Sequence, residues 1–223
     1  MNLESQSQSF KLIDKAFNKE TSSGSHLSFI LSLSGFTFCI FDLRQNRVIA
    51  LEEHIFQKQP NYESLSNQFE SFLLQSPVLN VKFKSVTIGI YNETVTMIPS
   101  ALFDENKKKE FLQFNFSIEN FSAKSDFLQE IDAQNVYDAP EIIIKTINER
   151  FNKARIVHFS SPLIESLSLE NKHKTGLKFY VHFFQKKNYG TGSRFEIIIF
   201  QEGKMLFFNS FNFQEKEDII YYV

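Results

Sequence analysis

The sequence predicts a duplicated α/β fold in which each half is built on a three-stranded antiparallel meander. The first observation is a run of strand, turn, strand, turn and strand over residues 27–56. The second is a run of the same kind over residues 179–213. The third is helical sequence between the two runs, because strands interleaved with helices are typical of layered α/β domains. We expect two mixed sheets, each starting with its meander and flanked by helices.

The composition fits a folded chain of one large domain or two small ones. The chain has 223 residues, 42% of them hydrophobic, and 27 are phenylalanine, which lacks a polar group, so we expect most copies to be buried. The net charge of −2 leaves no basic footprint and argues against a nucleic-acid partner. The single cysteine, Cys39, cannot form an internal disulfide and is expected to be a buried, inert thiol.

The N-terminal residues 1–25 are predicted to be a separate segment and linker. Apolar side chains at helical spacing over residues 10–17 predict a short amphipathic helix, and residues 21–25 (TSSGS) a flexible connector. The start is polar, and no run of about 18 apolar residues follows, so neither a signal peptide nor a membrane span is predicted. Together with the lone cysteine, this predicts a cytoplasmic protein.

The first meander is predicted from strict alternation. Leu27, Phe29 and Leu31 alternate with smaller or polar residues, which is the period of a strand. Ser34-Gly35 is predicted to form a tight turn, with Gly35 free to take a positive φ. Further strands follow at residues 36–40 and 48–56, on either side of a turn at residues 43–47.

Helices and short strands are predicted between the two meanders. Pro60 and Pro140 each precede a run with helical spacing, and Asp104 is placed to cap a charged helix whose lysines, Lys107 to Lys109, form a solvated face. Residues 120–133 are polar and are predicted to be irregular. The remaining predicted elements are strands at 84–91, 95–98, 114–118 (with Phe114 in the core) and 155–159, and a helix after Ser161-Pro162.

The second meander differs from the first in its turns. Its first turn, residues 186–193 (KKNYGTGS), is long and bears glycine, while its second is the tight Glu202-Gly203. An apolar run over residues 219–223 then ends the chain, leaving a helical stripe unfinished. We therefore expect a first half at 26–139 and a second half at 140–223 that is incomplete at its C-terminus, so that either the chain is truncated or a partner supplies the rest.

The candidates for chemistry are few. The five histidines are scattered without ligand spacing, so no metal site is predicted, and no P-loop, Rossmann or nucleophile-elbow pattern is present. Ser160-Ser161 is read either as a nucleophile pair or as the end of a strand and the cap of the next helix. Glycine hairpins can cradle phosphate with their backbone N–H groups, and the alternative is that both are ordinary loops. The candidate phosphate-contacting residues are Ser34, Gly35, Lys186, Lys187, Gly190, Thr191 and Gly192.

Four segments carry a family resemblance: SLSGFTFCIFD near the start, VTMIPSALFDE and RIVHFSSPLIESL in the middle, and LFFNSFNFQEKEDIIYYV at the end. On them the chain resembles the uncharacterised bacterial family called domain of unknown function 3822, within the actin-like ATPase (ribonuclease H-like) superfamily. The resemblance implies a duplicated actin-like fold with a longer C-terminal half, and nucleotide phosphates held between the first hairpins of the two meanders. In active members an aspartate at the end of the first strand holds the metal and water. Here Ser32 and Ser34 stand where that carboxylate is expected, residues 185–188 (QKKN) also lack it, and Asp42 lies at the far end of the next strand.

The resemblance and the missing aspartates together predict a non-catalytic actin-like protein, a pseudo-ATPase without a cofactor. Its predicted role is that of a scaffold or protein-interaction module, as in the cell-division and type IV pilus relatives, with a protein partner or a second copy. The alternative is a nucleotide-binding protein with weak ATPase or kinase-like activity that uses ATP with Mg²⁺, backbone amides and Lys186 or Lys187. An unrelated α+β binding domain is a third reading.

Overall fold

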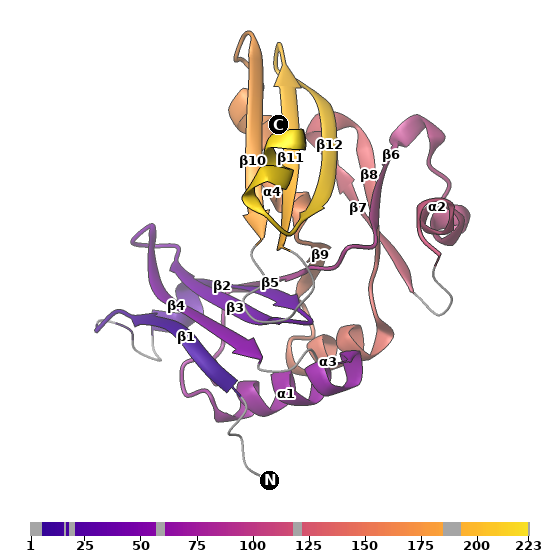
Figure 1. The fold of residues 1–223 in the computed structure, drawn as a ribbon. Helices are drawn as coiled ribbons and strands as arrows, with labels where there is room; N and C mark the ends of the chain where they lie inside the picture. Colours follow the sequence, from indigo (N-terminus) through magenta and orange to yellow (C-terminus); the bar gives the residue numbers. More distant parts are fainter. Residues whose placement is uncertain are drawn as a thin grey trace. The chain divides into compact units, whose positions relative to one another are not determined.

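Figure 1 shows the computed structural model of the chain, which describes residues 6–15, 17, 21–56, 61–117, 122–184 and 193–222. Contacts between its residues divide the chain into two compact units. The first comprises Met1–Asp126 and Gln134–Phe159, and the second Phe127–Ala133 and Ser160–Val223. These units are defined by which residues contact one another. The halves 26–139 and 140–223 rest instead on the repeated meander, and they stay a prediction.

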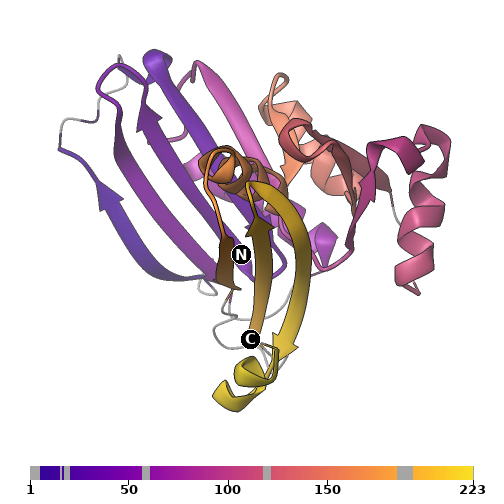
Figure 2. The same cartoon turned by 90° about the horizontal axis from the view of Figure 1, so that it is seen from above.

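The first unit contains a six-stranded mixed sheet in the order β1-β4-β3-β2-β5-β9. The predicted meander is confirmed as β2 (Ser25–Ser32), β3 (Gly35–Asp42) and β4 (Arg47–Phe56), which pair antiparallel. Two further strands, β5 (Ser85–Ile90) and β9 (Arg155–His158), run parallel to β2. In Figure 2 the strands of the meander lie side by side, coloured indigo to purple.

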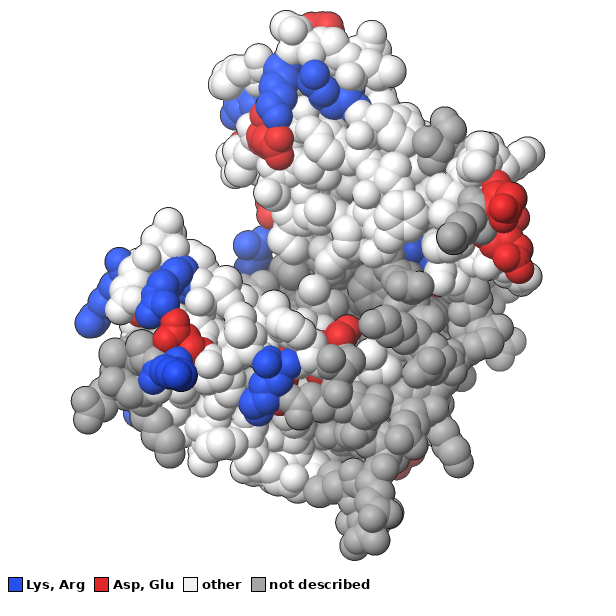
Figure 3. Space-filling model, turned by 60° about the vertical axis from the view of Figure 1, so that its left-hand side comes forward, with Lys and Arg blue, Asp and Glu red and all other residues white. Residues whose placement is uncertain are grey.

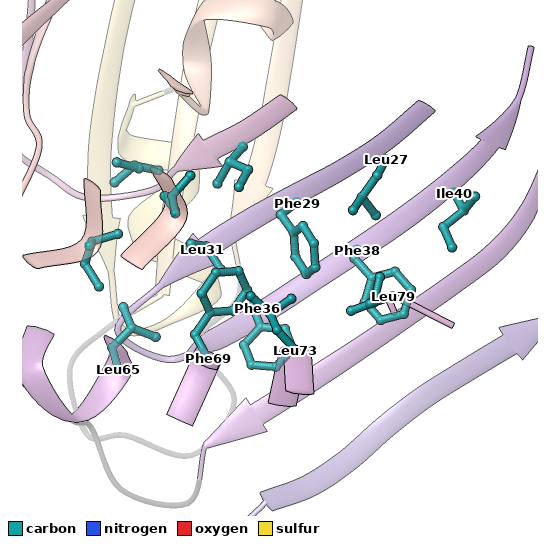
Figure 4. Close-up of a cluster of buried hydrophobic side chains, with 14 of the residues drawn as sticks. Leu27, Phe29, Leu31, Phe36, Phe38, Ile40, Leu65, Phe69, Leu73 and Leu79 are labelled. Carbon is teal, nitrogen blue, oxygen red and sulfur yellow. The ribbon is translucent and has the colours of Figure 1, made fainter. Parts of the chain in front are cut away.

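Helices α1 (Tyr62–Gln75) and α3 (Glu141–Arg150) supply the other layer of the core. The Asn61 side chain caps α1 by accepting from the N–H of Ser64, and Pro140 stands immediately before α3, as predicted. The apolar side chains that alternate along β2 and β3 gather with Leu65, Phe69 and Leu73 of α1 in one cluster, as Figure 4 shows. Phe29, for example, lies 5.2 Å from the ring of Phe69 in α1. Burial of this stripe fixes which face of the sheet the helices cover.

The N-terminal prediction of a helix over residues 10–17 is wrong. Residues Gln6–Ile13 form strand β1, which pairs antiparallel with β4 at the edge of the sheet. The side chains of Phe10 and Leu12 alternate with that of Lys11, a period-2 pattern that the helical spacing masked, and the open edge of β4 offers backbone hydrogen bonds that a short isolated helix lacks. The predicted connector is a 3-10 helix, η1 (Thr21–Gly24).

The segment between β5 and α3 holds more strand than the sequence predicted. Besides β6 (Val95–Pro99), it forms β7 (Ala123–Leu128) and β8 (Ala133–Asp138), joined by η4 (Gln129–Ile131), so irregular structure over 120–133 is wrong. The three strands form a sheet in the order β6-β8-β7. Short 3-10 helices, η2 (Ser100–Leu102) and η3 (Glu105–Lys107), follow β6.

A charged helix follows where one was predicted, but it extends into the residues that were predicted to begin a strand at 114–118. Asp104 caps η3 by accepting from the N–H of Asn106, and α2 (Lys108–Asn115) runs on through Phe114. Phe114 is therefore helical and 91% exposed, so its placement in a core strand is wrong. The helical conformation is favoured over the predicted strand because Phe111 and Leu112 pack inward from α2. The ring of Phe111 is stacked 6.1 Å from that of Phe103.

The second unit contains the second meander as a three-stranded antiparallel sheet of β10 (Leu177–Phe184), β11 (Ser193–Gln201) and β12 (Lys204–Phe213). The tight turn Glu202-Gly203 is confirmed, with both residues at positive φ. Helix α4 (Ser160–Asn171) starts at the serine pair, and α5 (Lys216–Tyr222) follows β12. A second mixed sheet was expected, whereas the described strands of this unit pair antiparallel only.

Opposite charges are interspersed on the described surface. On the face shown in Figure 3, lysine and arginine side chains lie next to aspartate and glutamate side chains. The pairs Lys172–Glu130, at 2.9 Å, and Lys174–Glu170, at 2.6 Å, are two such contacts. Among the helices described, none combines the length and the apolar character that crossing a bilayer requires.

Candidate functional site

The carboxyl ends of the parallel strands meet at one edge of the six-stranded sheet. Leu31 of β2 is in register with Ile90 of β5, which is in register with His158 of β9. In open α/β sheets ligands bind beyond this edge, since the loops that leave it converge there. The edge is therefore the place to look for the predicted phosphate-contacting hairpin and for any acid beside it.

The β2–β3 hairpin lies at this edge, with Leu33 and Ser34 as its turn residues. The Ser34 N–H donates to the Ser32 hydroxyl oxygen over 3.2 Å, and the two serine hydroxyls lie 2.8 Å apart. The Ser32 hydroxyl also donates to the Gly35 carbonyl over 3.1 Å. The N–H that a phosphate would use is thus already bonded within the hairpin, as in an ordinary serine-stabilised turn.

Gly35 takes the positive φ predicted for it, 149°, for a reason that the sequence did not reveal. A Cβ built on Gly35 would lie 2.0 Å from the carbonyl oxygen of His54 on the neighbouring strand β4. The glycine thus serves the close approach of two backbones as well as the turn.

The second predicted hairpin falls outside the described residues. This applies to Lys186, Lys187, Gly190, Thr191 and Gly192, whose role in contacting phosphate stays a prediction. The described strands that lead into it, β10 and β11, pair in register from Leu177–Gln201 to Phe184–Arg194.

A buried polar network that the sequence did not predict lies beside the strand ends of the first unit. Asp126 of β7 accepts from the backbone N–H of His158 over 2.7 Å and from the hydroxyl of Tyr137 over 3.3 Å. The His158 ring is fully buried, with Nε2 3.3 Å from the Asn92 carbonyl, and the Asn92 amide donates to the Asp138 carbonyl over 2.6 Å. Burial, followed by the charge of Asp126, raises the pKa of the Tyr137 hydroxyl. Asp126 therefore joins β7, β8 and β9 through its hydrogen bonds.

Removing the Asp126 carboxylate should destabilise the protein. The change Asp126→Ala leaves the His158 N–H without its acceptor in a buried site and leaves the Tyr137 hydroxyl with the Ile156 carbonyl, at 3.4 Å. We expect a loss of about 2–4 kcal/mol in the free energy of unfolding, measured by urea denaturation. The control Asp104→Ala removes an acid that caps the surface helix η3 and should cost about 1 kcal/mol. Equal losses in the two variants would contradict a structural role for the network.

In the part of the chain that the structure describes, no three histidine, cysteine, aspartate or glutamate side chains are grouped so as to hold a metal ion. Cys39 is half-buried rather than fully buried, and burial raises the pKa of its thiol. Ser160 and Ser161 are fully buried at the start of α4, which fits the helix-start reading of this pair.

An aromatic face lies on one side of the second meander. We use this name for Leu177, Phe179, Phe183, Phe195, Phe207, Phe211 and Phe213, which strand alternation and cross-strand register place together. Helix α5 covers part of it, with the ring of Tyr222 4.4 Å from that of Phe211. Phe179, Phe183 and Phe207 are exposed, as is Leu177 at 64%. A contiguous apolar surface of this kind is typical of sites where proteins bind one another.

Two solved structures resemble the chain in fold. A Bacteroides thetaiotaomicron protein with actin-like ATPase fold and unknown function is 26% identical, with a TM-score of 0.76 over 92% of this chain and 77% of that one. A chain of the PilM-PilN type IV pilus biogenesis complex is 12% identical, with a TM-score of 0.48 over 86% of this chain and 62% of that one, a likeness too weak to carry an argument.

The sequence comparisons identify the family. Among curated proteins, the DNA replication and repair protein RecF of Flavobacterium johnsoniae is 29% identical over 122 residues, which are 53% of this chain and only 31% of that protein. The family model described as "Protein of unknown function (DUF3822)" matches residues 14–223. The chain therefore belongs to this family of unknown function, and its fold is that of the actin-like ATPases.

Proposed function

We propose that this chain is a non-catalytic actin-like protein that acts as a protein-interaction module. The observation that carries the proposal is the chemistry at the carboxyl ends of β2, β5 and β9. There the described chain places Ser32, Asn92 and His158, and two carboxylates near them are already bonded: Asp126 accepts from two buried donors, and Asp138 accepts from the backbone N–H of Ser122. Phosphoryl transfer needs a carboxylate free to hold Mg²⁺ or orient water, whereas Asp126 and Asp138 are engaged in hydrogen bonds within the fold, which supports a non-catalytic role.

The interaction role is supported by the aromatic face of the second unit. Phe183 and Phe211 flank Phe195, which is fully buried, and the exposed Phe179 and Phe207 flank Ile199 further along the same face. The ring of Phe195 lies 5.9 Å from that of Phe183 and 5.5 Å from that of Phe211, so the aromatic side chains form one continuous cluster across the three strands. Aromatic clusters of this kind provide much of the binding free energy at protein interfaces.

The catalytic half of the proposal is tested by titrating the full chain with Mg-ATP in a calorimeter and by measuring phosphate release. We expect no saturable heat and no release above the rate of a protein-free blank. Saturable binding that is lost on Lys186→Ala with Lys187→Ala, but retained with Lys107→Ala and Lys109→Ala on the surface helix, would favour the nucleotide-binding alternative instead. Ligand that binds only the folded state also raises the melting temperature, which gives an independent readout.

The interaction half is tested with matched variants of the aromatic face. A partner isolated from the source cells with the full chain is purified, and its affinity for the wild-type chain is compared with that for Phe179→Ser/Phe207→Ser. We expect these changes to weaken binding by about tenfold or more, because each removes a large exposed apolar contact. The control Phe10→Ser/Phe114→Ser changes exposed phenylalanines of the first unit and should leave the affinity unaltered. Equal affinities for all three proteins would contradict a role for this face.

A further inference from the structure

Strand β1 is joined to the six-stranded sheet by its backbone, by Ile13 at its end, which packs against the core, and by charged side chains. It precedes residues 14–223, which the family shares, and pairs with β4 through a register that shifts between Gln8 and Phe10. The side chains of Phe10 and Leu12 are exposed, so they contribute little burial. The side-chain contacts that join this end of the chain to β4 include two ion pairs, Lys11–Glu52 and Asp14–Arg47.

The first ion pair reaches into the core. Glu52, which is 3% exposed, lies with one carboxylate oxygen 2.9 Å from Lys11 Nζ and with the other 2.7 Å from His54 Nε2. The His54 ring is buried, with its centroid 4.9 Å from the ring of Phe36 and 4.2 Å from that of Phe72. One buried carboxylate is thus shared between a lysine on β1 and a histidine on β4.

The charges that face His54 are those of Glu52 and Lys11. Burial lowers the pKa of His54 most, the hydrogen bond and charge of Glu52 raise it, and the charge of Lys11 lowers it. The other elements packed against the ring contribute apolar side chains, Phe36 from β3 and Phe72 from α1. The remaining acids on these elements are Glu53, which strand alternation turns to the opposite face, and Asp42, which accepts from the N–H groups of Arg44 and Gln45 at the other end of β3. On α1 they are Glu63 and Glu70, which are exposed.

We propose that the docking of β1 on β4 and the protonation of His54 oppose each other, so that acidification loosens β1 from the sheet. A buried carboxylate needs a cation near it, and either Lys11 or protonated His54 can serve. When both are charged they repel across Glu52, so each disfavours the other. The coupling is reciprocal. The free energy by which docked Lys11 disfavours protonation of His54 equals the free energy by which protonated His54 disfavours docking of β1.

The direction of the pH dependence follows from the lowered pKa. Folded His54 takes up its proton at a lower pH than the ordinary 6.5 of an unfolded histidine. Docking of β1 is therefore strongest above about pH 6.5 and weakens as the pH falls through the lower pKa of the folded state. Each unit by which docked Lys11 lowers that pKa corresponds to about a tenfold weaker docking equilibrium once His54 is protonated.

The first experiment measures the pKa of His54 in the full chain by NMR, with its ring signal identified by loss in His54→Gln. We expect Lys11→Met, which keeps the length of the side chain without its charge, to raise this pKa. The control Arg47→Met removes the other ion pair of this strand end, with Asp14, and should leave the pKa unchanged. An unchanged pKa in Lys11→Met, or an equal rise in Arg47→Met, overturns the proposal.

The second experiment follows β1 itself by amide hydrogen exchange near pH 5 and near pH 8, expressed as protection factors so that the intrinsic pH effect is removed. In the wild-type chain, protection of the β1 amides should fall at the lower pH relative to those of the buried strand β5. His54→Gln keeps an N–H that can donate to Glu52 but cannot titrate, so its β1 protection should be the same at both pH values. A wild-type chain without the fall, or a His54→Gln chain with the same fall, overturns the proposal.

Discussion

Replacing Gly35 by alanine should destabilise the protein by about 2–6 kcal/mol, enough to unfold a marginally stable domain. Two costs combine at this position. The backbone holds φ at 149°, which side chains rarely adopt, and the new Cβ would lie 2.0 Å from the His54 carbonyl oxygen. The backbone at Gly35 and the His54 carbonyl cannot move apart easily, because both belong to the paired strands β3 and β4. Urea denaturation of the full chain measures the loss.

Gly176→Ala is the matched comparison for the Gly35 substitution. Gly176 also takes a positive φ, 76°, but a Cβ there meets nothing within 4 Å. Its replacement should cost about 1 kcal/mol from backbone strain alone. The difference between the two variants then measures the close approach of β3 and β4 together with the greater strain of φ at 149°. If Gly35→Ala costs no more than Gly176→Ala, β3 and β4 can move apart at Gly35 without loss and their close approach has no energetic importance.

The two meanders could be predicted because burial on one face imposes a period of two on their sequences. Leu27, Phe29 and Leu31 all point into the same core, so the alternation survives in the sequence. Strand β1 could not be predicted in this way, because Phe10 and Leu12 lie exposed at the edge and burial does not constrain them. What makes residues 6–13 a strand is the unpaired edge of β4, which is fixed only once the sheet has formed.

Strands β7 and β8 were missed for a related reason. Their sequences, AKSDFL and AQNVYD, are polar because several side chains in them bond to the buried network rather than to solvent. The contact between Asp126 and His158 spans 32 residues, and that between His158 and Asn92 spans 66. No local pattern predicts pairs so distant, whereas the Ser34-Gly35 hairpin was predictable because its contacts are local.

The candidate site has a fold associated with ATPases, but polar groups at this edge of the sheet form hydrogen bonds with other groups of the same chain. At the end of β2, the hydroxyls of Ser32 and Ser34 bond to each other and to their own hairpin. Near the end of β9, Asp126 holds a backbone N–H. A catalytic site instead keeps charged groups poised for a ligand at some cost in stability. Bonding that stabilises the hairpin and the strand ends is what the proposed non-catalytic role leads us to expect.

Truncating Phe29 should be the most damaging side-chain change in the first unit, with a loss of about 3–5 kcal/mol in the free energy of unfolding for Phe29→Ala. The ring is 1% exposed and lies at the centre of an aromatic cluster, 5.4 Å from Phe38, 5.2 Å from Phe69 and 6.3 Å from Phe151. Figure 4 shows Phe29 among these packed side chains, so its removal leaves a cavity that β3 and α1 cannot fill without moving.

Phe114→Ala is the matched control, since the same atoms are removed from a side chain that is 91% exposed. It should change the free energy of unfolding by no more than about 0.5 kcal/mol. Because Phe29 contacts residues on β3, on α1 and just after α3, its loss should also lower the stability of all three together, seen as faster amide exchange throughout the first unit. Faster exchange confined to β2 would mean that the strands and helices of this unit unfold independently, and that the aromatic cluster does not unite them.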